Sequence, residues 1–492
     1  MAIQEGSHTG FRLLLLLFSM ALALALLWGA FSGSEPGSEP VAAKTSPRPN
    51  FVFILTDDMR KDELKYMPKT RALLKTHGMQ FKNAFVSNPL CCPSRATIMR
   101  GQYAHNTRVW FNSDSSLGGW QAYKSRGYEK NNVATHLHGA GYRTGLFGKY
   151  FNSYDGTTVP PGWDHWFGFV GNGDYFDYDV NINGNMQHRG NSKNAAYSTD
   201  VLSRQTQSFI ATSVRAGKPF FAYVSPKAPH DQLVPAPRDA YTYDGKKAPR
   251  PPSFNEKDVS DKPRWIEKQP KLTPTQIADI DDKYEARLET LQAADDLVNA
   301  VVNKLRRAGV LGNTYVVFTS DNGMQLGEHR ISHGKGRPYE ESVHMPLLVR
   351  GPGVPEGSTT DKLVLNTDFL PTFTDLAGTT TPRYVDGRSL RRVLTESATN
   401  WRTAILLEGR RGGDHPGDLN QMNYYGIVRR DRPGTTKYLE YEVGTQELYR
   451  LGGDPYEMRS TPRSSSATSL QKRLQALKGC AKASCRAAEN GQ

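Results

Sequence analysis

Two adjacent cysteines, Cys91 and Cys92, form the stretch of this sequence best suited to chemistry, and Pro93, Ser94 and Arg95 follow them. Neighbouring cysteines do not readily bond to each other, because a disulfide needs Cβ atoms that converge from suitably separated backbones. A thiol beside a serine and an arginine therefore indicates a reactive centre in a positive field. The alternative is a buried pair of small apolar thiols in a turn, since free cysteine usually packs as a hydrophobic residue.

Acidic residues follow two of the apolar runs that we expect to be strands. Asp57 and Asp58 follow the first run, and Asp321 and Asn322 follow a later one. Ligand sites of open α/β sheets lie at the carboxyl ends of strands, so these side chains are expected to meet. Three carboxylates and an amide oxygen are hard ligands, which favours Ca²⁺ or Mg²⁺ over zinc. Asp is also common in turns after strands, so the prediction depends on the pattern occurring twice in one chain.

Three basic side chains lie in short loops that also contain glycine or proline. Lys149 stands between Gly148 and Tyr150, His230 follows Pro229, and Lys335 lies between two glycines. Imidazole titrates near neutral pH, so His230 can supply a proton to a leaving group. Considered alone, a histidine in a loop more often has a structural role. Considered alone, each of the two lysines is more often a solvated surface amine.

The cysteine stretch, read as Cys-x-Pro-Ser-Arg with Gly101 behind it, resembles the signature of type I sulfatases. In that family the first cysteine of the signature is oxidised to formylglycine by a formylglycine-generating enzyme before folding finishes. By position that residue is Cys91, and Cys92 is its unmodified neighbour. The resemblance also implies one divalent cation, usually calcium, held beside the modified Cys91 by the residues matching Asp57, Asp58, Asp321 and Asn322.

The resemblance further implies roles for the basic residues. His230 matches the proton donor to the leaving alcohol, and Lys149 and Lys335 match the two lysines that contact the sulfate. Arg95 helps to anchor the modified cysteine. The hydrated aldehyde supplies a hydroxyl nucleophile, activated by the metal and by a carboxylate such as Asp321, and its second hydroxyl lets it release sulfate.

One position departs from the family pattern. Many members carry a histidine two residues after the first lysine, where it helps to break down the sulfated intermediate, and this chain has Phe151 there. The base for that step is therefore left open. His329 or His333 is a candidate, and either residue is equally compatible with a supporting or surface position.

Flanking motifs narrow the resemblance to N-acetylglucosamine-6-sulfatases and heparan 6-O-endosulfatases. These motifs are His105-Asn106, Gly148-Lys149-Tyr150 with Asn152, Pro160-Pro161-Gly162-Trp163, Val349-Arg350-Gly351-Pro352-Gly353 and Asn366-Thr367-Asp368. The resemblance runs from about Asn50 to Leu390. It implies a sulfuric ester hydrolase acting on a sulfated sugar or an aryl sulfate, and leaves open the sugar, the sulfate position and terminal or internal cleavage.

Two other functions fit parts of the same pattern. A phosphate or phosphonate monoester hydrolase can share the fold and the formylglycine. A non-catalytic binder of sulfated glycans would keep a basic cleft without the aldehyde.

Apolar runs alternate with helical segments through most of the chain, which predicts an α/β sandwich. The strand-like runs are Phe51 to Leu55, Gly145 to Phe147, Phe220 to Val224, Tyr315 to Phe318 and Leu347 to Val349. The helical segments are Pro68 to His77, Val133 to His138 and Pro274 to Ala308, the last with a capping box at Thr273 and Gln276. The resemblance implies an alkaline-phosphatase-like fold with a large, mostly parallel central sheet.

The pattern changes after about Trp401. Short strand-like runs separated by Gly, Pro and Asp predict a small antiparallel sheet over residues 401–465, and a helix is expected around Leu470 to Leu477. We therefore divide the chain into a signal peptide (1–33), a linker (34–48), a catalytic domain (49–400), an antiparallel subdomain (401–465) and a tail (466–492). Cys480 and Cys485 in the tail are close enough in sequence to form a local disulfide, which persists in an exported protein.

Charge and the first residues indicate where the protein works. The 492 residues carry a formal net charge of +13, which fits a polyanionic substrate or general solubility better than nucleic-acid binding. Arg12 precedes the apolar run Leu13 to Phe31, and Ala30-Phe31-Ser32 offers a cleavage site, so we expect secretion without stable membrane association. The run is also long enough for an uncleaved anchor. The sequence contains no Asn-x-Ser/Thr acceptor, which favours a bacterial source.

Overall fold

The computed structural model describes residues 48–190, 196–396, 398–410, 423–430 and 434–492, and strand β1 (Asn50–Thr56) lies at the centre of its main sheet. All seven residues of β1 are buried. Phe51 and Phe53 pack into the core on one face of the sheet, and Val52 and Ile54 pack into the core on the other. A continuous apolar run suits a strand that is buried on both faces, as the sequence predicted.

The main sheet is mixed, with a parallel centre. Strands β8, β1, β7, β3 and β4 are parallel neighbours, whereas β10, β5 and β6 pair antiparallel at the two sides. The order across the sheet is β11 (Ser358–Leu365), β2 (Met79–Phe85), β10 (Leu347–Arg350), β8 (Thr314–Ser320), β1, β7 (Phe220–Ser225), β3 (Arg143–Gly148), β4 (His165–Phe169), β5 (Tyr178–Ile182) and β6 (Asn185–Arg189), with β9 (His344–Met345) paired to β2. The predicted α/β class with a mostly parallel central sheet is confirmed.

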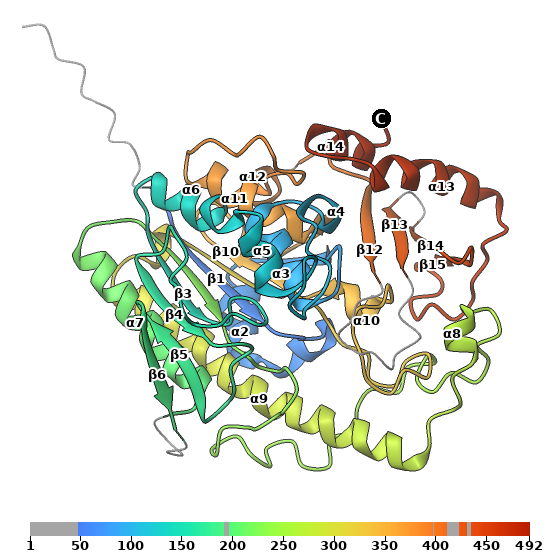
Figure 1. Cartoon of the computed structure of the whole chain (residues 1–492), viewed down its shortest axis with the longest axis horizontal. Helices are drawn as coiled ribbons and strands as arrows, with labels where there is room; N and C mark the ends of the chain where they lie inside the picture. The colour runs from blue at the N-terminus through green and yellow to red at the C-terminus, as the bar shows by residue number, and fades with distance from the viewer. Residues whose placement is uncertain (1–47, 191–195, 397, 411–422, 431–433) are drawn as a thin grey trace, which may run out of the picture. The chain divides into compact units, whose positions relative to one another are not determined.

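Helices cover both faces of this sheet (Figure 1). One face packs against side chains of α3 (Cys91–Arg100), α5 (Gly119–Ser125), α6 (Val133–Gly139), α11 (Phe369–Leu376) and α12 (Arg391–Thr395). The other face packs against α7 (Ser198–Arg215) and α9 (Pro274–Arg307), which lie against each other.

Helix α9 begins with the predicted capping box. The hydroxyl of Thr273 accepts a hydrogen bond from the Gln276 amide, and the Gln276 side chain accepts one from the Thr273 amide. Asp295 of this helix is buried and accepts hydrogen bonds from the amides of Lys69 and Thr70. The helix predicted over Pro68 to His77 is present as α2 (Pro68–Thr70), which continues directly into η2 (Arg71–Lys75).

Short helical turns occupy several connections. They are η1 (Lys61–Tyr66), α4 (Ala104–Thr107), η3 (Tyr128–Lys130), α8 (Arg264–Glu267), η4 (Leu311–Asn313), α10 (Glu340–Val343) and η5 (Asn366–Asp368). Among the residues described, none of the helices combines the length and apolar character needed to cross a bilayer. The predicted signal peptide (1–33) and residues 34–47 of the predicted linker lie outside the described residues.

A second sheet follows, as predicted. It is antiparallel and contains β12 (Ala404–Gly409), β13 (Tyr424–Arg430), β14 (Thr435–Tyr441) and β15 (Gln446–Arg450) in sequence order. Helices α13 (Ser465–Lys478) and α14 (Ala483–Asn490) follow it. Leu470, Leu474 and Leu477 of α13 are fully buried in the same core as this sheet. Cys480, in the connection after α13, forms a disulfide with Cys485 of α14.

Candidate active site

The tips of two neighbouring parallel strands bring the predicted acidic residues together. Thr56 at the end of β1 lies opposite Ser320 at the end of β8. The amide of Asp321 donates to the Thr56 carbonyl at 3.1 Å, and the amide of Asp58 donates to the Asp321 carboxylate at 3.1 Å. The parallel register therefore places Asp57 and Asp58 beside Asp321.

Cys91 reaches the same place from the first residue of α3. Its side chain is fully buried, with the sulfur 3.4 Å from Asp57 Oδ1 and 3.9 Å from Asp58 Oδ1. Lys335 Nζ lies 3.0 Å from the sulfur. Burial, followed by the negative charge of Asp57, raises the pKa of this thiol well above its usual value. The thiol is therefore protonated at neutral pH and is a poor nucleophile in this form.

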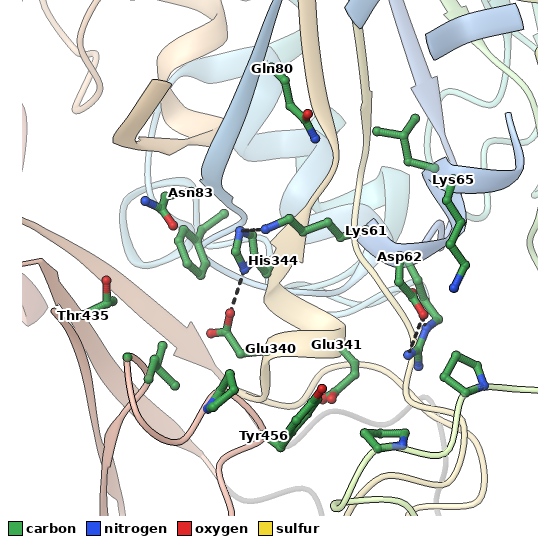
Figure 2. Close-up of a pocket in the computed structure, with 18 of the residues that line it drawn as sticks. Lys61, Asp62, Lys65, Gln80, Asn83, Glu340, Glu341, His344, Thr435 and Tyr456 are labelled. Atoms are coloured by element: carbon green, nitrogen blue, oxygen red, sulfur yellow. Dashed lines mark hydrogen bonds and ion pairs between the residues drawn. The ribbon is translucent and has the colours of Figure 1, made fainter. Parts of the chain in front are cut away.

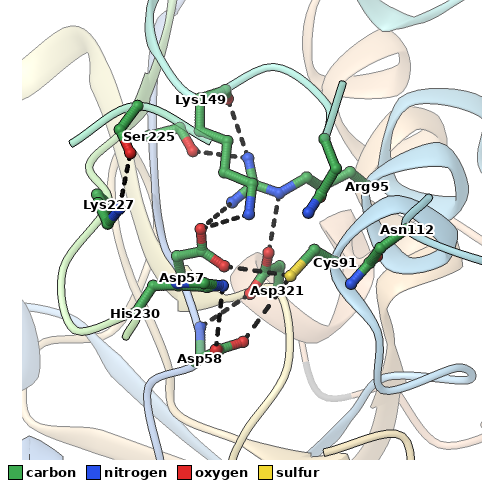
Figure 3. Close-up of polar contacts among 12 residues, drawn as sticks. Asp57, Asp58, Cys91, Arg95, Asn112, Lys149, Ser225, Lys227, His230 and Asp321 are labelled. Carbon is green, nitrogen blue, oxygen red and sulfur yellow. Dashed lines mark hydrogen bonds and ion pairs between the residues drawn. The ribbon is translucent and has the colours of Figure 1, made fainter. Parts of the chain in front are cut away.

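Three cations contact the acidic residues, and two of them, the buried Arg95 and Lys149, are labelled in Figure 3. Lys149 Nζ lies 2.6 Å from Asp57 Oδ2, and Arg95 Nε lies 2.8 Å from Asp321 Oδ2. Lys335 Nζ lies 2.6 Å and 2.8 Å from the two oxygens of Asp58. Each predicted acidic residue thus has its own cation, and the three cations come from three separate parts of the chain.

The carboxylates respond differently to this environment. Burial opposes ionisation of Asp57, but the charges of Lys149, His230 and Arg95 outweigh it and hold its pKa well below the usual range. At Asp321 burial and the neighbouring Asp57 dominate, and they raise its pKa to about 7. Asp321 therefore takes up a proton easily, whereas the neighbouring Asp57 does not.

His230 lies at the open side of the group. Its Nε2 is 3.7 Å from Asp58 Oδ2, and 18% of the side chain is exposed. Burial and the charge of Lys335 lower its pKa to about 4, although Asp58 and Asp57 oppose the change. The imidazole is therefore neutral at pH 7 before a substrate binds.

The predicted metal ligands are close together, though not all are equally available. Ligand atoms of Asp57, Asp58, Cys91 and His230 lie within 4.8 Å of one another. Asp321 is occupied by Arg95 and by the Asp58 amide. Asn322 donates to Asp58 at 2.6 Å, and its buried Oδ1 has no hydrogen-bond partner among the described residues. This set is rich in oxygen atoms and includes the buried Asn322 Oδ1, which has no hydrogen-bond partner among the described residues. Such a set fits a hard divalent cation.

The two histidines considered as the missing base lie in different surroundings. His333 Nε2 is 3.2 Å from Asp231, the neighbour of His230. His329 is fully buried, and its Nδ1 is 2.7 Å from Glu256. Phe151, at the divergent position, is buried and packs against Tyr123 and Tyr150.

Sequence reasoning missed two residues that support the site. Ser225 at the end of β7 accepts a hydrogen bond from Arg95 at 2.8 Å. Arg287 of α9 is fully buried, pairs with Glu63 at 2.6 Å and donates to the Asp58 carbonyl at 2.6 Å. A charged residue within the apolar stripe of a helix was the available signal for Arg287.

Two cavities lie near these elements. The larger, a groove of about 950 Å³, is lined by residues of η1, β2 and α10 and by the turn after β15, and includes none of the predicted site residues. The smaller, of about 320 Å³, is lined by His230, Asp231, Lys227 and polar residues of the β4–β5 connection. Only the smaller of these two cavities is lined by a predicted catalytic side chain, that of His230.

Comparisons with known proteins agree with this geometry. The family model described as Sulfatase matches residues 49–379, and the one described as N-sulphoglucosamine sulphohydrolase, C-terminal, matches residues 327–481. The chain is 37% identical over 376 residues to the extracellular sulfatase SULF-1 homolog of Drosophila melanogaster, covering 74% of this chain and 33% of that protein. It is 33% identical over 512 residues to the N-acetylglucosamine-6-sulfatase of Homo sapiens, covering 95% of this chain and 90% of that protein.

A solved structure also matches over most of its length. It is a complex of a protein with its substrate D-glucosamine-2-N,6-O-disulfate, with a TM-score of 0.71 and 25% identity. The match covers 88% of this chain and 97% of that one. The chain spans a third of the Drosophila protein and nine-tenths of the human one. Because the Sulfatase family model matches most of this chain, the chain belongs to the sulfatase family.

Proposed function

We propose that this chain is an enzyme that hydrolyses sulfate esters of glucosamine-containing glycans. The observation that carries the proposal is the buried Cys91 at the start of α3, in contact with Asp57 and Lys335. The sulfated glucosamine named in the matched complex and the name of the human relative support this substrate class. An aryl sulfate is the simplest substrate for an initial assay.

Cys91 is the residue that we expect to be converted to formylglycine. The fully buried position supports modification before folding finishes, by a formylglycine-generating enzyme that acts on the extended chain. Once hydrated, the aldehyde supplies a hydroxyl nucleophile where the protonated thiol is a poor one. Cys92, whose sulfur lies 3.3 Å from the Asn152 side chain, is expected to stay a thiol.

Calcium is the cation that we assign to the acidic group, with magnesium as the second choice. Asp57, Asp58, Asp321 and Asn322 would hold it together with the modified Cys91. Carboxylate and amide oxygens suit a hard ion, and the unpartnered Asn322 oxygen and the raised pKa of Asp321 both favour an added positive charge. When bound, the ion polarises the sulfate and lowers the pKa of a coordinated hydroxyl.

The fixed cations are placed to hold the sulfate group. Lys149 contacts Asp57 and Lys335 contacts Asp58, and their ammonium groups can stabilise negative oxygens without rearrangement. Arg95 is held by the Lys149 carbonyl at 2.9 Å and by Ser225, so it positions the first turn of α3 against Asp321.

His230 is the proposed proton donor to the leaving alcohol. Its pKa of about 4 is too low for this role in the free protein, because burial and Lys335 disfavour the imidazolium. A sulfate ester bound against Lys335 brings a compensating negative charge, which favours the protonated ring. We therefore expect protonation of His230 to accompany substrate binding.

The sugar is assigned to the 320 Å³ cavity beside His230. Its lining includes the side chains of Asn172, Asp174, Lys227 and Gln232, which offer donors and acceptors to ring hydroxyl groups. Lys227 donates to Asp174 at 2.7 Å and is itself buried, so this wall is held in place before the sugar arrives.

The deciding assay measures sulfate released from glucosamine 6-sulfate and from defined sulfated oligosaccharides. We expect turnover by the wild-type chain and a loss of at least about 1,000-fold in Cys91→Ala. Equal or faster turnover of nitrophenyl phosphate than of nitrophenyl sulfate would favour the phosphate or phosphonate hydrolase. Glycan binding without any turnover, together with an unmodified Cys91, would favour the binder.

Secretion and the division of the chain are also proposals. The extracellular relatives support export, and the N-terminal run is assigned to a signal peptide. We assign residues 49–400 to the catalytic domain, 401–465 to the antiparallel subdomain and 466–492 to the disulfide-containing tail. The second sheet and α13 share one apolar core, which supports treating them as a supporting subdomain.

A further inference from the structure

His329 is a residue that the proposed reaction does not use, and one of its two ring nitrogens is available to bind a ligand. The side chain is fully buried, and its Nδ1 lies 2.7 Å from the Glu256 carboxylate. Its Nε2 has no hydrogen-bond partner among the described residues. Burial and the charge of Lys262 lower its pKa to about 3, so the ring is neutral. With Nδ1–H donating to Glu256, the lone pair of Nε2 is available.

Glu256 is suited to hold this tautomer. Burial raises its pKa to about 7, but the ammonium of Lys262, 3.6 Å from its other oxygen, opposes the rise and favours the carboxylate. The Tyr339 ring packs against the imidazole at a tilt of 36°, with the two ring centroids 4.5 Å apart. The imidazole is therefore fixed in orientation on two sides.

Two carboxylates converge on the same point from other segments. Glu341 belongs to α10 and Glu457 to the turn after β15. One ligand atom each of His329, Glu341 and Glu457 lies within 4.8 Å of the other two. The Oε2 atom of Glu341 is buried and has no hydrogen-bond partner among the described residues. Glu457 is almost fully buried, and its Oε2 accepts a hydrogen bond from the Glu340 amide at 2.8 Å.

Further acidic side chains and two basic ones lie around these three residues. Arg60 pairs with Glu328 at 2.9 Å, and Lys437 pairs with both Glu340 and Glu457 at 2.7 and 2.8 Å. The group therefore places four carboxylates beside two fixed cations, and Arg60 is shared with Asp62 at 2.9 Å. Burial raises the pKa of Glu341 well above its usual value, and the nearby Glu328 adds to the effect. The four carboxylates are those of Glu328, Glu340, Glu341 and Glu457.

One of these three residues, Glu341, lies at an open groove. Glu341 lines the groove of about 950 Å³, together with Glu340, His344 and Tyr456 (Figure 2). His329 and Glu457 are not among the residues that line the groove, and 0% and 1% of their surface is exposed. The arrangement is a buried ligand set with one ligand at the wall of an open groove.

We propose that His329, Glu341 and Glu457 bind one Zn²⁺ ion, at a site separate from Asp57 and Asp58. An imidazole nitrogen with two carboxylates favours zinc over calcium, which prefers an all-oxygen set. The hydrogen bond from His329 to Glu256 is the outer contact that usually orients a metal-binding histidine. The ion shares Glu457 with Lys437, which limits its affinity.

The proposed zinc joins three segments that are far apart in sequence. His329 lies six residues before Lys335 in the same loop, Glu341 begins the segment that leads to β9, and Glu457 belongs to the C-terminal part of the chain. Metal binding by such a set contributes directly to folding stability, because the unfolded chain does not assemble the ligands. The site would therefore anchor the loop that carries Lys335.

The test is zinc binding by the full chain with the first site filled by millimolar Ca²⁺. Equilibrium dialysis against Zn²⁺, followed by elemental analysis, should find one zinc per chain in the wild type and in Asp321→Asn. His329→Gln and Glu341→Gln should bind at least about 100-fold more weakly, and Glu256→Gln about 10-fold more weakly.

Glu341→Gln is the deciding variant, because its amide keeps the shape of the glutamate and its side chain lines the groove. Its far-ultraviolet circular dichroism and its Tm without zinc check the fold. Zinc should raise the Tm of the wild type and leave that of Glu341→Gln unchanged. The proposal is overturned if the wild type binds no zinc under calcium, or if Glu341→Gln binds it as tightly. Either result is independent of whether the chain has sulfatase activity.

Discussion

Lys335 Nζ lies 3.0 Å from the Cys91 sulfur, although the two residues are 244 positions apart in the chain. The same nitrogen contacts both oxygens of Asp58. Burial disfavours the charged amine, but Asp58, Cys91 and Asp57 outweigh it and raise the pKa of Lys335 well above its usual value. The ammonium is therefore a permanent positive charge at the atom where the nucleophile is expected.

Replacing Lys335 by Met should lower kcat/KM for a sulfate ester by about 100-fold or more, because it removes a fixed charge from the developing anion. Steady-state kinetics on nitrophenyl sulfate measure the change. Lys65→Met serves as the matched control, since Lys65 lines the larger groove, away from the predicted site residues. A Lys335→Met variant as active as this control would remove Lys335 from the mechanism.

Cys92→Ala should keep turnover within a few-fold of the wild type, while Cys91→Ala loses it. Cys92 is buried beside Asn152 and Asn112, so its loss should cost about 1 kcal/mol of stability through packing. Urea unfolding and sulfate release measured on the same samples separate the two effects. Equal loss of activity in both cysteine variants would contradict the assignment of distinct roles.

Arg287→Met should destabilise the fold by about 3–5 kcal/mol, because it leaves Glu63 buried without its partner. It should also reduce activity, since Arg287 donates to the Asp58 carbonyl. The shift of the urea midpoint measures the stability effect. Arg287→Met combined with Glu63→Gln removes the unpaired charge and should recover part of the loss, and no recovery would refute this explanation.

The His105–Glu408 pair should make stability depend on pH on the alkaline side. Their side chains are 11% and 0% exposed and lie 2.8 Å apart. Burial opposes the imidazolium, but Glu408 outweighs it and raises the pKa of His105 to about 9. Because this folded-state value exceeds the unfolded value near 6.5, the stabilisation is complete below about pH 6.5 and is lost as pH rises through 9.

The His105–Glu408 pair contributes at most about 3 kcal/mol to the free energy of unfolding. Thermal unfolding of the wild type and of His105→Gln at pH 6 and pH 9.5 tests it. The difference in Tm between the two proteins should be larger at pH 6. A difference that is the same at both pH values would show that the charge of His105 contributes nothing.

The sequence was informative where a local pattern and a general rule of sheet geometry coincide. Asp57 and Asp321 follow strands that are parallel neighbours, so the rule about carboxyl ends placed them together before any coordinates were known. The capping box at Thr273 is equally local, and α9 begins where it was expected.

Long-range partners were not predictable in this way. Asp295 accepts a hydrogen bond from the Thr70 amide in the first turn of α2 from 225 residues away, and no pattern within Pro68 to His77 indicates this contact. Glu256, whose partner is His329, lies between β7 and α8, outside every element that the sequence predicted. These contacts depend on how the elements pack, and no periodicity within either segment encodes them.

The most direct test of the central claim is mass spectrometry of the peptide that contains Cys91 and Cys92. The chain is produced together with a formylglycine-generating enzyme, alkylated after unfolding, and digested with trypsin, and its sulfatase activity is measured on the same preparation. The account predicts an aldehyde at Cys91 and one alkylated thiol at Cys92, with activity proportional to the aldehyde content. Two alkylated thiols in a fully active preparation would contradict it.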